Sequence, residues 1–97
     1  MGCLSADLLL GDVHSLKEKR SVVRPIVAEL ARRFSVSAAE TDHQELYRRS
    51  EVSVAVASGD RAHVVEVLDR CERLIAGRPE IDLLATRRRV LVAEDLD

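Results

Sequence analysis

The first apolar residues of the chain follow a period of two. Between Cys3 and Gly11 every second residue is apolar, in the order Leu4, Ala6, Leu8 and Leu10. This alternation is typical of a strand that buries one face, because successive side chains of a strand point to opposite sides. Gly11 and Asp12 break the pattern, so we predict that the first strand ends there.

A capping box predicts where a long helix begins. Ser15 is followed three residues later by Glu18, so each side chain can accept from a free backbone N–H of the first turn. Apolar residues then recur as they do on one helix face, at Leu16, Val23, Ile26, Val27, Leu30 and Phe34. Pro25 cannot donate a hydrogen bond to the Ser21 carbonyl, which predicts a kink or a restart capped by Ser21.

The remaining segments complete the predicted secondary structure. In chain order they are a strand over Phe34–Glu40 with Phe34, Val36 and Ala38 inward, a polar connection over Thr41–Arg49, a valine-rich strand over Val52–Ala57, a helix from its cap Asp60 to Gly77, and a strand within Ile81–Ala93. Three arginines interrupt the apolar residues of this last strand, which is therefore predicted to be long or broken.

The order of these elements predicts the fold class. A β-α-β-β-α-β chain that forms one domain over residues 1–97 is the ferredoxin-like α+β pattern, with a four-stranded antiparallel sheet in the order 4-1-3-2. Right-handed crossovers place both helices on one face of the sheet. The open face would be small-residue and mildly polar, lined by Ser5, Asp7, Leu9, Ser35, Ser37, Ala39, Ser53, Ala55 and Ala57. Because Leu9, Ala39, Ala55 and Ala57 make this flat surface semi-apolar, we predict a homodimer.

The composition of the 97-residue chain narrows the functional classes. With 46% hydrophobic and 33% charged residues it is typical of a globular protein. No apolar run approaches the roughly 20 residues of a membrane span, and Met1 leads into the first strand without a signal-peptide pattern, so we expect a cytoplasmic protein. Cys3 and Cys71 show neither zinc-ligand spacing nor a disulfide framework, and we expect no metal and no other cofactor.

Positive charge is concentrated in the first predicted helix, although the whole chain carries a net charge of −2. Residues 14–33 contain six cations and two acids, whereas residues 34–60 contain two cations and five acids. The candidate residues for binding a nucleic acid or another partner are Lys17, Lys19, Arg20, Arg24 and Arg32. Such a basic helix face is either simply solvated or binds phosphates or another anionic partner. Because the pI of the sequence is about 5.9, we expect RNA binding to be weak. Because aromatic side chains are almost absent, we expect that binding to have little sequence preference. We expect no DNA binding.

Two smaller groups of residues are secondary candidates for binding a partner. Arg87 and Arg89 share one face of the last strand, where they either protect a sheet edge from aggregation or extend the basic surface. His14 and His43 form the other group. Together with the Asp42–Glu45 loop they could form an acid–base or metal site, but no short spacing presents two ligands from one rigid element.

Three segments resemble the YlxP-like family of small bacterial proteins. They are HSLKEKRS at residues 14–21, DHQEL at residues 42–46, and DRAH at residues 60–63 after the valine strand. The family is described as a domain of unknown function with a ferredoxin-like fold, and the similarity covers nearly the whole chain. Its genes commonly lie beside those for a translation initiation factor and a ribosome-maturation factor. The resemblance implies a role near ribosome assembly or translation, and it transfers no catalytic residue.

Three functions are therefore open. We expect a non-enzymatic accessory protein of ribosome assembly or translation that contacts ribosomal RNA or a ribosomal protein through the basic helix face. The first alternative is a homodimeric interaction protein that pairs through its open sheet. The second alternative is a small enzyme or metal-binding protein that uses His14 and the Asp42–Glu45 loop.

Overall fold

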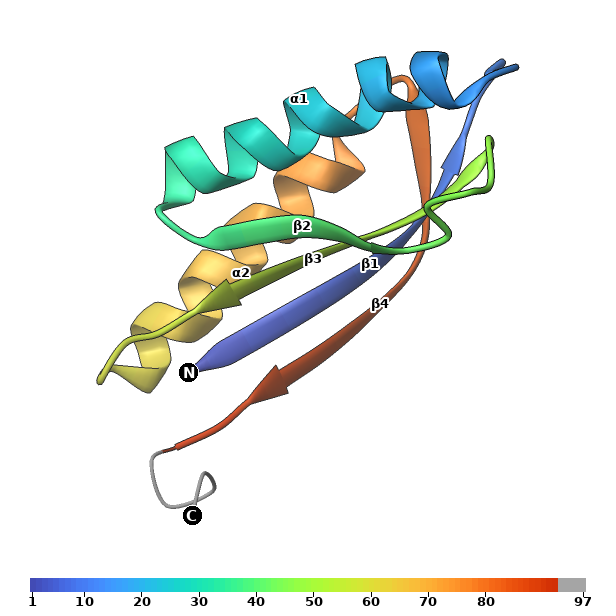
Figure 1. Ribbon diagram of the computed structural model, residues 1–97. Coiled ribbons are helices and arrows are strands. Elements are labelled where there is room, and N and C mark those ends of the chain that lie inside the picture. Colours follow the sequence, from blue (N-terminus) through green and yellow to red (C-terminus); the bar gives the residue numbers. More distant parts are fainter. Residues whose placement is uncertain (93–97) are drawn as a thin grey trace.

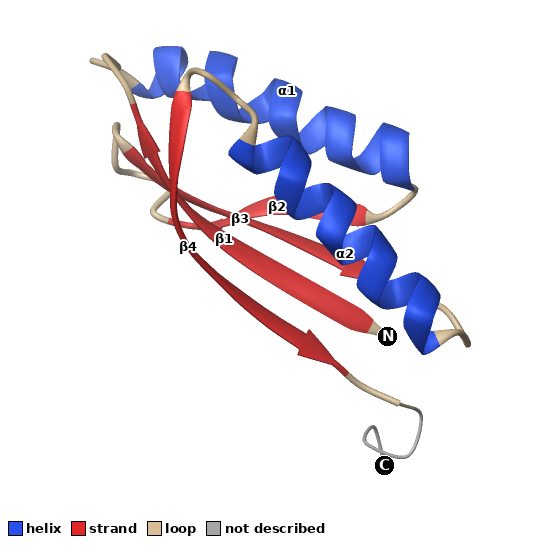
Figure 2. Cartoon of the chain, turned by 180° about the vertical axis from the view of Figure 1, so that it is seen from behind, coloured by secondary structure: helices blue, strands red, loops and turns tan. Residues whose placement is uncertain are grey.

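The computed structural model describes residues 1–92, which form a single antiparallel sheet and two helices. The elements are β1 (Gly2–Leu10), α1 (Leu16–Phe34), β2 (Ser37–Asp42), β3 (Arg49–Val56), α2 (Arg61–Ala76) and β4 (Ile81–Val90). The sheet order β2-β3-β1-β4 is the predicted order read from the other edge. Both helices cover one face of the sheet, as Figure 1 and Figure 2 show from opposite sides. The ferredoxin-like α+β fold is confirmed.

The central strand β1 organises the hydrophobic core. Its inward residues Leu4, Ala6, Leu8 and Leu10 are at most 1% exposed. The strand pairs with β3 on one side and β4 on the other, and α2 packs across all three. At Gly2 a side chain would collide with Val64 and Leu68 of α2, so glycine permits the close approach of helix and strand at this end.

The start of α1 agrees with the predicted cap at Ser15, whereas the Glu18 carboxylate binds the backbone N–H of the residue before the cap. The Ser15 hydroxyl accepts a hydrogen bond from the Glu18 N–H at 3.1 Å, and the Glu18 carboxylate accepts one from the His14 N–H at 3.3 Å. Of the two alternatives predicted at Pro25, the restart at Ser21 is wrong, because α1 continues without interruption through Pro25, and the kink stays a prediction. Both Ser21 and Pro25 are exposed, so the Ser21 carbonyl that lacks its helical partner can reach water instead.

The predicted beginning of β2 is also wrong. Phe34 is the last residue of α1, and Ser35 ends the helix in the left-handed conformation with φ 54°. The strand then runs from Ser37 to Asp42. Phe34 follows Leu30 by four residues and precedes Val36 by two, so its spacing fits both a helix and a strand. In the structure it belongs to the helix. Val36 and Ala38 do pack against the core, as predicted.

The second half of the chain follows the prediction with small shifts. The strand β3 begins earlier than predicted, at Arg49, and the carboxylate of Asp60 caps α2 by accepting from the N–H groups of Ala62 and His63. The strand β4 is long and unbroken; Ala93, the last residue of its predicted range, lies outside the described residues. Neither described helix is long and apolar enough to cross a membrane.

The core predicts a large effect of one truncation. Leu68 on α2 is fully buried, and Leu68→Ala should lower the free energy of unfolding by about 2–5 kcal/mol because it removes apolar contact and leaves a cavity. Urea unfolding followed by circular dichroism measures the change. Leu84→Ala is the matched control, since Leu84 is 48% exposed. Equal losses from the two variants would contradict this description of the core.

Candidate functional site

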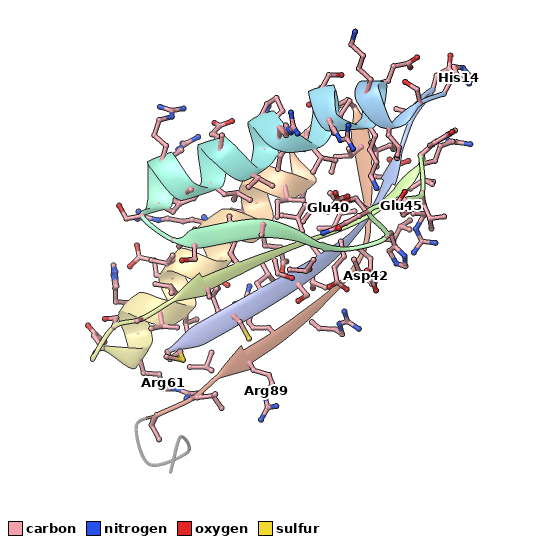
Figure 3. All side chains as sticks on the ribbon, viewed as in Figure 1. His14, Glu40, Asp42, Glu45, Arg61 and Arg89 are labelled. Carbon is pink, nitrogen blue, oxygen red and sulfur yellow. The ribbon has the colours of Figure 1, made fainter. Side chains whose placement is uncertain are left out.

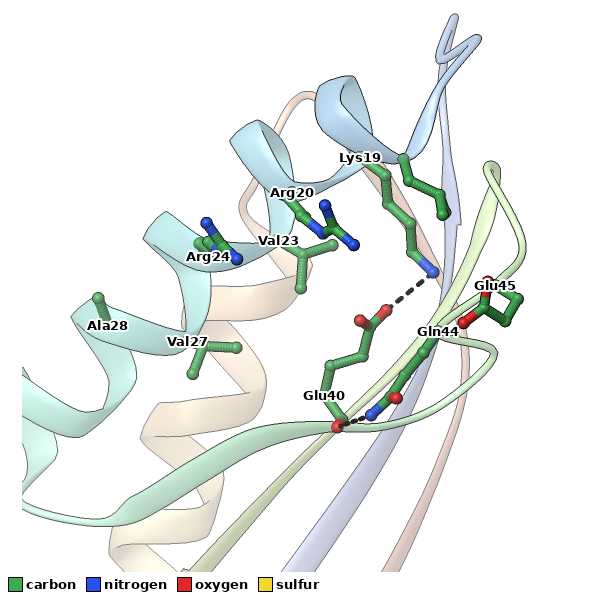
Figure 4. A pocket seen from close by; sticks show the side chains of 10 residues that line it. Lys19, Arg20, Val23, Arg24, Val27, Ala28, Glu40, Gln44 and Glu45 are labelled. Carbon is green, nitrogen blue, oxygen red and sulfur yellow. Dashed lines mark hydrogen bonds and ion pairs between the residues drawn. The ribbon is translucent and has the colours of Figure 1, made fainter.

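Two of the segments that carry the family resemblance meet beside the amino-terminal half of α1. Between this half and the connection from β2 to β3 lies a pocket of about 410 Å³. It is lined by Leu16, Lys19, Arg20, Val23, Arg24, Val27, Ala28, Glu40, Gln44 and Glu45. Figure 4 shows the basic side chains of α1 on one side and the loop residues on the other. The pocket thus joins the basic helix to the predicted polar loop.

An ion pair lies at the floor of this pocket. The Nζ of Lys19 is 2.9 Å from the Glu40 Oε2, and it also donates a hydrogen bond to the backbone carbonyl of His43. The Ser50 hydroxyl donates to the same Glu40 oxygen at 2.6 Å. Since Lys19 is only 2% exposed, its assignment to the partner-binding surface is wrong, and its charge is used inside the fold.

The positions of Lys19 and Glu40 in the apolar pattern indicate burial. Lys19 precedes Val23 by four residues and Ile26 by seven, so it lies on the apolar face of α1. Glu40 follows Ala38 by two residues and therefore points to the same side of β2. Glu40 is not among the residues predicted for a site, although an acid and a base on two facing apolar surfaces are the signal of a buried ion pair.

The pocket combines an apolar wall with polar groups. Val23, Val27 and Ala28 of α1 form the apolar side. On the loop side, the Gln44 side-chain amide donates to the Glu40 backbone carbonyl at 3.1 Å. Glu45 is exposed and, within the described part of the chain, has no ion pair. The pocket can therefore hold a group that is partly apolar and partly charged.

Three of the predicted cations line a second, shallower hollow on the outer side of α1. The hollow measures about 360 Å³ and is lined by Lys17, Arg20 and Arg24 together with Ser21 and Pro25. All three cations are exposed, and none forms an ion pair or hydrogen bond with any residue in the range 1–92. We call Lys17, Arg20 and Arg24 the basic triad. Arg32 is exposed too, but it lies further along α1 and lines neither hollow.

The two histidines do not form a common site. The Nε2 of His14 is 2.7 Å from the Asp12 Oδ1, at an exposed position. His43 adopts a positive φ of 59° in the β2–β3 connection, and its Nδ1 is 4.0 Å from the Asp42 Oδ1. In residues 1–92 no three His, Cys, Asp or Glu side chains are grouped in a way that could hold a metal ion.

Arg87 and Arg89 lie on the open face of the sheet, away from α1. Figure 3 shows Arg89 on β4 at the far end from His14, and Arg87 forms an ion pair with Glu51 of β3. Arg88 points to the other face and pairs with Asp69 of α2 at 2.7 Å. The edge position of β4 agrees with the protective role, whereas the alternative that the arginines extend the basic surface of α1 is wrong.

Polar side chains on the open face of the sheet form hydrogen bonds with one another. Hydroxyl groups of Ser5 and Ser53 lie 2.9 Å apart, and Thr41 joins Ser53 at 2.7 Å and the Glu51 carboxylate at 2.8 Å. These hydrogen bonds across β1, β3 and β2 satisfy much of the polar surface within one copy. The homodimer through this face stays a prediction.

Comparison with known proteins identifies the family. Residues 1–88 match the model of a family described as "Protein of unknown function (DUF503)". The chain belongs to this DUF503 family. It is also 31% identical over 87 residues to a protein of Bacillus subtilis (strain 168) described as "Uncharacterized protein YlxP", a match that covers 90% of this chain and 95% of the relative. The resemblance to YlxP-like proteins is confirmed, and the description of neither the family nor the relative names an activity.

The two cysteines differ in their surroundings, and this predicts their reactivity. Burial raises the pKa of the Cys71 thiol above its ordinary value, an effect that Arg88 partly opposes, whereas Cys3 is exposed on β1. Since the thiolate is the reacting form, we expect a thiol reagent at neutral pH to modify one cysteine of the native protein. Cys3→Ser should abolish this rapid modification, and Cys71 should react only in denaturant. Two rapidly reacting thiols in the native protein would contradict the burial of Cys71.

The buried ion pair predicts a strong coupling between its two members. Glu40→Leu leaves the Lys19 ammonium buried with only the His43 carbonyl, and it should cost on the order of 3 kcal/mol of unfolding free energy. The double variant Lys19→Met with Glu40→Leu should recover most of that loss, because it removes the unpaired charge. Urea unfolding of the three proteins measures the coupling.

An exposed ion pair supplies the control for this experiment. Glu66 and Arg70 on α2 are 2.5 Å apart and more than half exposed, so Glu66→Leu should change stability by less than about 1 kcal/mol. A double variant that is less stable than Glu40→Leu alone would show that the unpaired Lys19 charge does not destabilise the fold.

Proposed function

We propose that the protein is a non-enzymatic accessory factor of ribosome assembly or translation that binds RNA phosphates through the basic triad. The observation that carries the proposal is the hollow bounded by Lys17, Arg20 and Arg24, three exposed cations with no acidic partner among residues 1–92. A phosphate group placed there would meet three positive side chains at once.

The distribution of ion pairs supports this choice of surface. Arg33, Arg70, Arg78, Arg87 and Arg88 each pair with a carboxylate. Arg33, Arg70 and Arg73 also line one hollow, but Arg33 and Arg70 are paired with carboxylates. The triad is different, since none of its three cations has an acidic partner in the described residues 1–92. With a chain net charge of −2, attraction of RNA must come from this local concentration of charge.

The expected mode of binding follows from the side chains at this surface. Guanidinium and ammonium groups bind phosphate oxygens, which position a protein on RNA but carry no sequence information. The hollow contains no aromatic side chain on which a base could stack. Binding should therefore be weak and nearly independent of sequence, and the implied genomic association with ribosome maturation makes ribosomal RNA the proposed target.

A salt series tests the proposal. Each phosphate contact contributes a slope of roughly 0.7–0.9 in the dependence of log affinity on log salt concentration, because condensed counterions are released. Replacing Lys17, Arg20 and Arg24 by Gln should flatten the slope by about 2. The measurement is co-sedimentation with ribosomal subunits and binding to isolated ribosomal RNA between low and physiological salt.

A second triple variant controls for net charge. Arg61, Arg73 and Arg89 are exposed and lie on other elements, so their replacement by Gln changes the charge equally but spares the hollow. Only the triad variant should lose affinity, while circular dichroism shows both to be folded. If the two variants bind alike at every salt concentration, α1 is merely solvated and the proposal fails.

A further inference from the structure

The strand β2 presents an open edge to solvent. It lies at the end of the sheet and pairs with β3 on one side only. Outside the sheet ladders and the helices, no backbone-to-backbone hydrogen bond of residues 1–92 reaches Ser37–Asp42. The Glu40 carbonyl accepts a hydrogen bond from the Gln44 side chain, and this side chain would have to move for a further strand to bind that carbonyl. Such a row of backbone groups is a template for a further strand.

The two edges of the sheet differ in how they are protected. The other edge strand, β4, carries Asp82 and the arginines of residues 87–89, and charged side chains of this kind oppose pairing with another chain. The β2 segment SAAETD contains no Lys, Arg or Pro. Its carboxylates are Glu40, which is paired with Lys19, and Asp42 at the end of the strand. The remaining protection consists of the short length of β2, the irregular pairing between Glu40 and Asp42, and the Gln44 side chain that binds the Glu40 carbonyl.

The 410 Å³ pocket lies directly beside this unprotected edge. A strand added to β2 would direct every second side chain toward α1, at intervals of roughly 6.6 Å. The pocket offers a matching pair of environments, since Val23, Val27 and Ala28 are apolar, and Arg20 and Arg24 are cations without acidic partners among residues 1–92. The two arginines are one helical turn apart, or about 6 Å along α1.

We propose that β2 binds an extended segment of a partner protein as a fifth strand, with an apolar side chain in the pocket and an acidic side chain on Arg20 and Arg24. Backbone hydrogen bonds to the edge supply affinity, and the pocket supplies specificity. The inference goes beyond RNA binding, because it assigns the inner side of the same helix a protein ligand of defined pattern: an apolar and an acidic residue two positions apart.

A second copy of this chain fits the same edge less well. In β2 the acidic side chain that faces the helices is Glu40, which is already paired with Lys19. Asp42 ends the strand beyond an irregular pairing. The β2 strand of another copy therefore brings no free carboxylate to Arg20 and Arg24, whereas an acidic partner segment does.

Selection from a random dodecapeptide library displayed on phage tests the proposal on the full-length protein. Enriched peptides should carry an acidic residue two positions from an apolar residue. A representative peptide, made synthetically, should lose binding when it is N-methylated on the backbone nitrogens that face β2, because these can no longer donate to the strand edge. No enrichment, a basic consensus, or indifference to N-methylation would overturn the proposal.

Substitutions in the pocket distinguish this site from the RNA surface. Ala28→Leu fills the apolar part of the pocket at an exposed helical position. It should lower the affinity for the peptide by about tenfold or more, by analogy with added methylenes in closed pockets. Ala62→Leu on α2 is the matched control and should have no effect. Ala28→Leu should leave the salt slope of RNA binding unchanged, whereas Lys17→Gln should reduce that slope and spare the peptide.

Two further results would overturn the proposal for β2. If Ala28→Leu does not affect the peptide, the pocket is not its binding site and the proposal fails, whatever the result for RNA. Sedimentation equilibrium of the protein without peptide should show no dimer that Ala28→Leu disrupts. A dimer with that sensitivity would mean that a second copy occupies the edge and would overturn the partner assigned here.

Discussion

The candidate site depends on one buried contact, the ion pair between Lys19 of α1 and Glu40 of β2. Lys19 also holds the His43 carbonyl, and Glu40 also accepts from Ser50, so four segments of backbone are joined at one point. The pocket floor and the position of the β2–β3 connection follow from it. Because α1 is fixed there, Arg20 and Arg24, one and five residues further on, are presented at the edge of β2.

Such a contact contributes more to geometry than to stability. The free energy needed to remove two charges from water is about as large as the energy of their attraction, unless further hydrogen bonds satisfy the charged groups. Here Ser50 donates to the Glu40 carboxylate, and the His43 carbonyl accepts from the Lys19 ammonium. Apolar residues of similar size would fill the same space without directional contacts. The ion pair and its hydrogen bonds instead join α1, β2, β3 and the β2–β3 connection at defined atoms.

Sequence patterns predicted most of the fold because each strand and helix has a regular apolar face and a recognisable cap. Errors arose where two periods overlap, as at Phe34, and where solvent satisfies a lost hydrogen bond, as at Pro25. The exposed cations of α1 could be predicted as a group. The position of Gln44 and Glu45 beside these cations could not be predicted. The approach of their loop to α1 is set by the ion pair between residues 19 and 40, which are distant in sequence.

The two proposed ligands of α1 use adjacent sides of one helix. Lys17 lines the outer hollow but not the inner pocket, whereas Arg20 and Arg24 line both. At physiological ionic strength charges are screened beyond roughly 8 Å, so a chain of slight negative charge gains from RNA only at direct contact. A ribonucleoprotein surface that offers a phosphate and an acidic strand side by side would engage both sides of α1, and the shared arginines would make the two contacts interdependent.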